Sequence, residues 1–347
     1  MFFSAKSSPA QLSQALAKCL ADFFKLDAQQ TAPWISLDSD KLHINLPFVA
    51  ETLHPALSSQ LQAVLSQHKS AVQHILINSK IAAAPTRMAK VGKIKNIIAV
   101  ASGKGGVGKS TTAVNLALAL QAEGARVGVL DADIYGPSIP IMLGNPQATP
   151  ASEDQQRVEP MQAHGLVASS IGYFVPAENA TVWRGPMASK ALAQLLNETN
   201  WPELDYLIVD MPPGTGDIQL TLAQQMPVSA ALVVTTPQDL ALADATKGIA
   251  MFNKVNVPVL GIVENMSYHI CSHCGHREAI FAEQGGDKLA KQNQLPLLAQ
   301  LPLDITIRSH ADGGTPLQIS QPEHALSETY RQLARNVSQA LSFRCNN

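Results

Sequence analysis

The feature that most constrains this chain is a glycine-rich run between an apolar strand and a helix. The run consists of Gly103, Lys104, Gly105, Gly106, Val107, Gly108, Lys109, Ser110 and Thr111. It fits the pattern G-x-x-x-x-G-K-[ST], and the apolar stretch 96–101 before it and the helical pattern 112–121 after it supply the structural context that this pattern requires. The sequence therefore predicts a loop that cradles the phosphates of a nucleotide.

Each residue type in this run has a physical function next to a phosphate. Glycines let successive backbone N–H groups close around phosphate oxygens, and the N-terminus of the following helix adds positive partial charge. Lys109 can reach the β and γ phosphates, and the Ser110 hydroxyl can bind Mg²⁺. The alternative is an ordinary glycine-rich turn between a strand and a helix, for which this spacing and context are not needed.

The rest of the chain from residue 96 onward predicts an α/β fold. Apolar strands alternate with helical patterns, and they are expected at 97–101, 127–130, 206–209, 231–234 and 259–263. Such nearly continuous apolar runs are typical of a mostly parallel sheet that helices cover on both faces. Ligands bind beyond the carboxyl ends of the strands in sheets of this type.

The chain of 347 residues is long enough for more than one domain. Residues 1–80 predict a small α+β domain with the order helix, hairpin, helix, strand, because their apolar residues change from helical spacing to alternation and back. Residues 81–95 are short of large apolar groups and predict a linker. We expect residues 96–347 to form the nucleotide-binding domain.

Two of the predicted strands end in aspartates. Asp131 and Asp133 follow the strand 127–130, and Asp210 follows the strand 206–209. A carboxylate at the end of an apolar strand beside a phosphate loop is typical of a Mg²⁺ ligand, held directly or through water. Asp210 is the residue expected in that role. The alternative for each aspartate is a structural one, capping the turn or helix that follows.

Cys271 and Cys274 form a C-x-x-C pair in a short stretch that also contains three histidines. Two thiolates supply half of a four-ligand site, and the chain has no second C-x-x-C. A homodimer with its axis near this loop would bring two pairs together. The alternatives are a zinc site completed by His273 or His276, a redox pair and simple packing.

The run 103–111 resembles the deviant Walker A loop of the MinD/ParA-type ATPases, because Lys104 follows its first glycine. The segments 133–138, 210–217 and 263–266 and the C-x-x-C pair narrow this resemblance to the Mrp/ApbC branch of iron–sulfur cluster carrier ATPases. The resemblance implies that Lys104 acts across a dimer interface on the partner's nucleotide and that Asp133 orients the attacking water. It also implies that Asn265 contacts the adenine and that a loop with Pro302 and Asp304 lies near the base.

This resemblance implies a cytoplasmic, homodimeric P-loop ATPase that binds ATP, Mg²⁺ and an iron–sulfur cluster, expected to be [4Fe–4S] and shared between two subunits. Its implied partners are iron–sulfur scaffold proteins and recipient apoproteins. Residues 1–80 resemble, more weakly, the MIP18-like domain that precedes the ATPase in many bacterial members, and their departures from its pattern favour a docking or regulatory role.

Three other functions fit parts of the sequence. A MinD/ParA-type positioning ATPase would act on a membrane or on DNA, but the net charge of −2 and the absence of a long apolar segment predict neither a nucleic-acid nor a membrane partner. A zinc-binding P-loop ATPase would use the cysteines and histidines of one chain. A kinase or metabolic P-loop enzyme with a small-molecule acceptor would leave the cysteine pair without a function.

Overall fold

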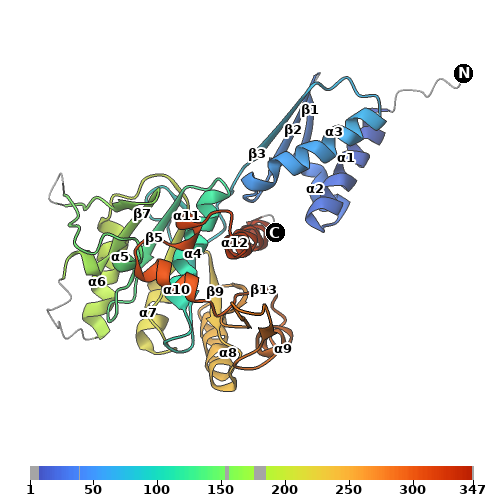
Figure 1. Cartoon of the computed structure of the whole chain (residues 1–347). Helices are drawn as coiled ribbons and strands as arrows, with labels where there is room; N and C mark the ends of the chain where they lie inside the picture. The colour runs from blue at the N-terminus through green and yellow to red at the C-terminus, as the bar shows by residue number, and fades with distance from the viewer. Residues whose placement is uncertain (1–7, 39, 153–155, 176–184, 346–347) are drawn as a thin grey trace, which may run out of the picture. The chain divides into compact units, whose positions relative to one another are not determined.

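The computed structural model describes residues 8–38, 40–152, 156–175 and 185–345. The chain divides into two compact units, residues 1–82 and 83–347. Figure 1 shows the helices and strands of both units. Among the described helices, none combines the length and the apolar character that crossing a membrane requires.

The small unit packs helices against a three-stranded sheet. Its elements are α1 (Pro9–Phe24), α2 (Ala28–Thr31), η1 (Ala32–Trp34), β1 (Ile35–Asp38), β2 (Lys41–Leu46), η2 (Glu51–Leu53), α3 (His54–Gln67) and β3 (His74–Ser79). β2 lies between β1, to which it is antiparallel, and β3, to which it is parallel. Alternation along β2 buries Leu42 and Ile44, and α1 contributes Leu16 and Leu20 to the same core.

The large unit contains the predicted α/β fold. Its strands are β4 (Ile94–Ala101), β5 (Val127–Asp131), β6 (Met161–Ala163), β7 (Leu166–Ser170), β8 (Leu204–Asp210), β9 (Ala230–Thr235), β10 (Val259–Glu264), β11 (His269–Ile270), β12 (Arg277–Glu278) and β13 (Leu297–Gln300). Its helices are α4 (Lys109–Ala122), α5 (Ile139–Met142), η3 (Ile171–Tyr173), α6 (Gly185–Glu198), α7 (Asp217–Gln225), α8 (Asp239–Lys254), α9 (Gly285–Gln292), α10 (Ile305–Asp312), α11 (Leu317–Ser320) and α12 (Ala325–Cys345).

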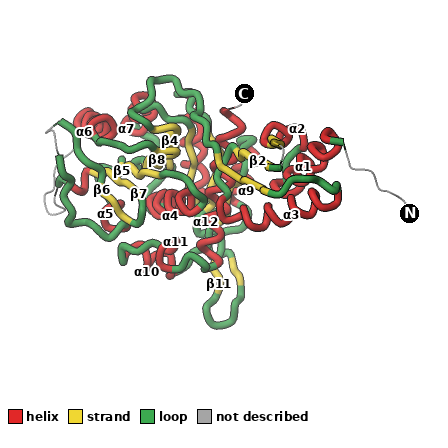
Figure 2. The backbone as a smooth tube through the Cα atoms, turned by 90° about the horizontal axis from the view of Figure 1, so that it is seen from above, coloured by secondary structure: helices red, strands yellow, loops and turns green. Residues whose placement is uncertain are grey.

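Eight strands of this unit form one sheet in the order β13-β10-β9-β4-β8-β5-β7-β6. All neighbours in it are parallel except β6 and β7. Helices α4 and α12 pack against each other on one face of the sheet and α6 and α7 pack together on the other (Figure 2), where α7 also contacts α8. Every residue of β8 is buried, as expected of a strand covered on both sides. The predicted fold class is confirmed.

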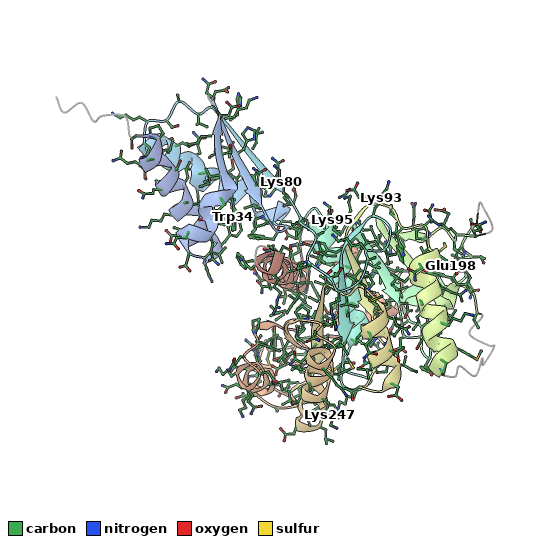
Figure 3. The ribbon with its side chains drawn as sticks, turned by 180° about the vertical axis from the view of Figure 1, so that it is seen from behind. Trp34, Lys80, Lys93, Lys95, Glu198 and Lys247 are labelled. Atoms are coloured by element: carbon green, nitrogen blue, oxygen red, sulfur yellow. The ribbon has the colours of Figure 1, made fainter. Side chains whose placement is uncertain are left out.

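Charged residues at the end where the strands begin, here called the amino edge, form a closed ion cluster. The carboxylate of Asp205 accepts hydrogen bonds from Lys95 Nζ at 2.8 Å and from the Arg126 side chain at 2.9 and 3.0 Å (Lys95 is labelled in Figure 3). Burial acts to raise the pKa of Asp205, but these hydrogen bonds outweigh it and lower the pKa to about 2. The cluster joins the second residues of β4 and β8 to the residue just before β5.

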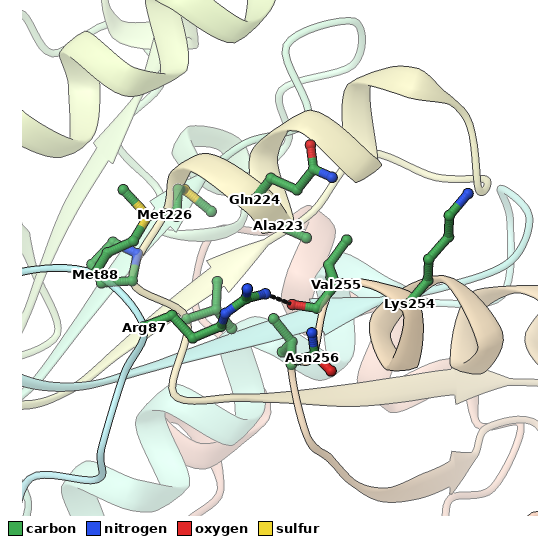
Figure 4. A pocket seen from close by; sticks show the side chains of 11 residues that line it. Arg87, Met88, Ala223, Gln224, Met226, Lys254, Val255 and Asn256 are labelled. Atoms are coloured by element: carbon green, nitrogen blue, oxygen red, sulfur yellow. Dashed lines mark hydrogen bonds between the residues drawn. The ribbon is translucent and has the colours of Figure 1, made fainter.

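A cavity of about 400 Å³ also lies at the amino edge, between the segment after residue 83 and the ends of α7 and α8. Figure 4 shows Arg87 inside it, where Nη1 donates a hydrogen bond to the Val255 carbonyl at 2.6 Å. This carbonyl follows the last turn of α8, and an arginine there satisfies a group that the helix leaves unpaired. The cavity therefore lies next to the hydrogen bond by which Arg87 holds the first segment of the large unit against the end of α8.

Candidate nucleotide site and cysteine hairpin

The phosphate loop joins β4 to α4 at the opposite, carboxyl edge of the sheet. Gly106 and Gly108 both have φ of +80°, a conformation that only glycine adopts without strain. A Cβ on Gly103 would overlap the backbone of Asp244 in α8, and a Cβ on Gly108 would overlap the side chain of Asn265. The glycines of the motif are thus required both by the path of the loop and by its close neighbours.

Three predicted site residues converge on the side chain of Lys109. Its Nζ lies 2.6 Å from Asp210 Oδ1, 3.7 Å from Asp133 Oδ2 and 3.3 Å from Ser110 Oγ. Lys109 is 6% exposed and Asp210 is fully buried, so these charges interact in a low-dielectric environment. The structure brings together the lysine predicted to bind phosphate, both predicted Mg²⁺ ligands and the aspartate predicted to orient water.

The charge balance at this point is negative. Burial raises the pKa of Asp131 to about 7, with the charge of Asp210 as the second cause, and burial also raises the pKa of Asp133 and of Asp210. Asp210 Oδ2 is buried and has no hydrogen-bond partner among the described residues. An unpaired carboxylate oxygen beside a serine hydroxyl is a donor set that suits Mg²⁺, so the residues present fit that ion.

Asp131 shapes the loop that presents Asp133. Its carboxylate accepts hydrogen bonds from the backbone N–H groups of Asp133, Ser138 and Ile139 at 3.1 to 3.2 Å and from Ser170 Oγ at 3.0 Å. Asp131 therefore caps the turn that follows its strand, which is the structural alternative given for it in the sequence analysis. Ser170, at the end of β7, is a partner that the sequence analysis did not identify.

A cavity of about 590 Å³ opens between the phosphate loop and α10, a size that accommodates a nucleotide. The predicted residues on its wall are Gly105, Gly106, Gly108, Lys109, Ser110, Thr111, Asp133, Asn265, Pro302 and Asp304. Gly103, Lys104, Val107 and Asp210 are not among its lining residues. The wall also includes Ile307, Arg308 and Ala311 of α10, which the sequence analysis missed. An Asp after a Leu-Pro-Leu segment is a helix N-cap signal that could have indicated this helix.

The residues expected near the base already have protein partners. Asn265 Nδ2 donates a hydrogen bond to the Val107 carbonyl at 2.8 Å, which links the end of β10 to the phosphate loop. Asp304 Oδ1 accepts one from the Thr306 backbone N–H at 2.7 Å and caps α10. Contact with a base therefore requires the Asn265 amide to exchange or share its bond to the loop.

Lys104 differs from Lys109 in its surroundings. Its backbone carbonyl accepts a hydrogen bond from Ser102 Oγ at 2.8 Å, whereas its half-buried side chain has no ion pair or hydrogen bond within the described residues. The phosphate loop holds the backbone of Lys104 in place, and its ammonium group remains available for a partner outside the chain.

Cys271 and Cys274 lie on a hairpin that projects from the large unit (Figure 2). β11 and β12 pair antiparallel, and the Cys271 N–H donates to the His276 carbonyl at 2.9 Å. Backbone N–H groups of Cys274 and His273 lower the pKa of the Cys271 thiol by stabilising its thiolate. No group of three metal-ligating side chains occurs in the described ranges of the chain. The thiols are thus presented as a pair.

A family model for the ParA group, described as the NUBPL iron-transfer P-loop NTPase, matches residues 93–338 of the chain. This match covers more than half of the chain and contains both the phosphate loop and the cysteine hairpin. The protein belongs to this family. The predicted membership of the iron-transfer branch of the P-loop NTPases is therefore confirmed.

Individual relatives of this iron-transfer NTPase support the same family assignment. It is 53% identical to the iron-sulfur cluster carrier protein of Escherichia coli K12 over 97% of this chain and 95% of that protein. It is 56% identical to the protein of the same name from Haemophilus influenzae over 88% of this chain and 83% of that one.

Solved structures confirm the fold. A nucleotide-binding protein of Archaeoglobus fulgidus in complex with ADP is 36% identical, with a TM-score of 0.60 over 69% of this chain and 93% of that chain. The cell division ATPase MinD of Pyrococcus furiosus is 22% identical, with a TM-score of 0.53 over 70% of this chain and 98% of that chain. The likeness to MinD concerns the fold alone.

Proposed function

We propose that this P-loop NTPase hydrolyses ATP and carries a [4Fe–4S] cluster that two copies of the chain hold through Cys271 and Cys274. It receives the cluster from a scaffold protein and transfers it to recipient apoproteins. The observation that carries this proposal is the pair of free thiols, one half-buried and one exposed, on a hairpin that starts shortly after Asn265, a residue of the nucleotide cavity. The names of the relatives from Escherichia coli and Haemophilus influenzae support the same function.

Two copies are proposed because one chain provides only two thiolates for a cluster that takes four. Cys271 is half-buried and Cys274 is exposed, so a second hairpin can approach both sulfur atoms. The accessibility of this pair also suits release, because a recipient's cysteines can reach the cluster without unfolding the carrier.

At the nucleotide site, we propose the roles that the resemblance implies, and the contacts of Lys109 with Asp133, Asp210 and Ser110 support them. Lys109 binds the phosphates after it exchanges its contact with Asp210 for them. Ser110 and Asp210 would hold Mg²⁺, which when bound neutralises phosphate charge. Asp133 orients the attacking water. Lys104 contacts the nucleotide of the second copy, as an arginine finger does in related reactions.

Anaerobic reconstitution with iron and sulfide tests the cluster proposal. We expect one cluster for two chains, measured by iron, sulfide and absorbance, together with a change from monomer to dimer. Cys271→Ala and Cys274→Ala should each abolish iron uptake while ATP affinity stays close to that of the parent protein. Cys19→Ser and Cys345→Ser are matched controls, because both thiols lie elsewhere and burial raises the pKa of each.

A different metal content would contradict this proposal. One tightly bound zinc ion per chain after both aerobic and anaerobic purification, with no uptake of iron, would favour the zinc-binding alternative. Transfer is tested by incubating the reconstituted protein with an apoprotein that needs a [4Fe–4S] cluster and following that protein's activity.

A further inference from the structure

A short, well-connected segment leads from the nucleotide cavity to the cysteine hairpin. Asn265 lines the cavity, and the residues after it pair with the segment 301–303, which also lines the cavity at Pro302 and Leu303. The Leu301 N–H donates to the Glu264 carbonyl at 2.8 Å, and the Ser267 N–H donates to the Leu301 carbonyl at 2.9 Å. The two segments are therefore held together next to the cavity.

Both backbone polar groups of Leu303, its N–H and its carbonyl, contact the base of the hairpin. Its N–H donates to the Tyr268 carbonyl at 2.7 Å, and its carbonyl lies 3.0 Å from Nδ1 of His269. Since a carbonyl oxygen only accepts, Nδ1 carries the proton in this contact. His269 is the first residue of β11, so its ring connects the wall of the nucleotide cavity to the strand that leads to Cys271.

Beyond these two hydrogen bonds of Leu303, residues 268–278 have no other hydrogen bond to the body of the large unit among the described residues. The bonds of residues 270–278 are internal, such as that between Gly275 and Cys271. Arg277 lies over the ring of Tyr268 at 3.8 Å and closes the base of the hairpin. His273 and His276 are exposed and have no side-chain hydrogen bond in the described part of the chain. Figure 2 shows the hairpin projecting away from the rest of the unit.

We propose that His269 is a positioning residue that transmits nucleotide occupancy to the cysteine pair. A nucleotide that displaces Leu303 moves both atoms by which this residue binds the base of the hairpin, and the His269 ring carries that displacement into β11. The orientation of Cys271 and Cys274 then differs between the free and the nucleotide-bound protein. This inference rests on the proposed function for its purpose, because a carrier needs its cluster ligands to respond to the nucleotide.

The test measures thiol reactivity in the reduced, metal-free, full-length chain. The rates at which iodoacetamide alkylates Cys271 and Cys274 are followed by peptide mass spectrometry, with and without saturating MgADP. The protein concentration is one at which sedimentation shows a monomer, so that contact between two copies does not contribute. The variants are His269→Ala, which removes the contact, and His269→Asn, whose amide nitrogen occupies the place of Nδ1. His273→Ala and His276→Ala are the matched controls.

We expect MgADP to change the alkylation rates of Cys271 and Cys274 in the parent protein. In His269→Ala, the rate with MgADP divided by the rate without it should be close to one for each cysteine. A single hydrogen bond shifts an equilibrium by about 2- to 13-fold, which sets the size of the loss. His269→Asn should restore most of the nucleotide response, and the two control variants should keep it. All variants should still bind MgADP, which shows that they are folded, and His269→Ala should change the affinity by no more than about the same 2- to 13-fold.

A ratio in His269→Ala equal to that of the parent protein would overturn the inference, as would an equal loss in His273→Ala. A parent protein whose thiols do not respond to MgADP would also overturn it. Iron uptake is measured separately on the same samples. Failure of that uptake contradicts the proposed function and leaves the thiol measurement valid, because the thiol measurement uses no metal.

Discussion

The two edges of the central sheet use the same kinds of charged residues in opposite ways. At the amino edge, Asp205 is bound by Lys95 and Arg126, and its pKa falls to about 2. At the carboxyl edge, burial and neighbouring negative charge raise the pKa of Asp131 to about 7, and one oxygen of Asp210 has no partner in the described part of the chain. The charges of the amino edge find their partners within the chain, whereas those of the carboxyl edge need a ligand to balance them.

This difference indicates where the protein gains stability and where it gives up stability for function. Ion pairs with matched hydrogen bonds favour the folded state. Buried carboxylates with one lysine disfavour it, because desolvation of each charge is incompletely compensated. Substitutions at the carboxyl edge should therefore change chemistry more than stability, and substitutions at the amino edge should do the reverse.

The largest expected effect distinguishes the two lysines of the phosphate loop. Lys109→Ala should abolish both ATP binding and hydrolysis, because Lys109 lines the cavity and contacts Asp133 and Asp210. Lys104→Ala should bind MgATP normally and hydrolyse it about 10³-fold or more slowly, as loss of a finger residue does. Equilibrium binding and phosphate release measure the two properties. An equal loss of ATP affinity in both variants would contradict a role for Lys104 across a dimer interface.

Asp133→Asn should have the next largest effect. It keeps the shape of the side chain and removes its charge, so hydrolysis should fall by about 10²- to 10⁴-fold while MgATP affinity is retained. Because burial raises the pKa of Asp133 despite Lys109, activity of the parent protein should fall on acidification at a higher pH than an exposed aspartate would dictate. Initial rates between pH 5 and 8 measure this. Wild-type turnover by the variant would exclude Asp133 from the reaction.

The sequence predicts the carboxyl edge better than the amino edge, for a physical reason. The phosphate loop is a contiguous motif, and each strand-end aspartate directly follows an apolar run, so local pattern places these residues at one edge of the sheet. The cluster of Lys95, Arg126 and Asp205 joins residues far apart in the chain, and no local pattern shows their pairing.

The missed elements have similar causes. β6 and β7 comprise three and five residues, too few for a clear apolar period. β4 begins at Ile94, inside the expected linker 81–95, because Ile94 pairs with Leu204 of β8. The contact of Asn265 with Val107, and that of His269 with Leu303, depend on how loops from different strands meet, which spacing along the chain does not reveal.

Asp205→Asn removes the carboxylate at the centre of the ion cluster of the amino edge. Its folded pKa of about 2 lies below the ordinary value of 3.8, so its stabilisation is present above about pH 4 and lost as pH falls toward 2. At pH 7 the variant should lose about 2 kcal/mol of unfolding free energy, and at pH 2 to 3 the difference should shrink toward zero. Glu203→Gln is the control, because Glu203 is exposed and pairs with Arg126 at 3.0 Å. Denaturant unfolding measures both. ATP turnover should not change.

Asp131→Asn tests the carboxyl edge, where the contribution of the carboxyl group to stability should depend on pH in the direction opposite to that of Asp205. A folded pKa of about 7 means that the folded carboxyl keeps its proton after the unfolded one has released it, so its contribution to stability declines as pH rises from about 4 to 7. Asparagine does not ionise, so the stability of the variant relative to the parent protein should increase between pH 5 and pH 8, by about 2 to 3 kcal/mol. Ser170→Ala removes one hydrogen bond to Asp131 but keeps the carboxyl, so it should retain the pH slope of the parent. Denaturant unfolding at both pH values decides the question. A constant difference between Asp131→Asn and the parent would mean that Asp131 is ionised throughout, and that the two edges of the sheet do not differ in the way their pKa values indicate.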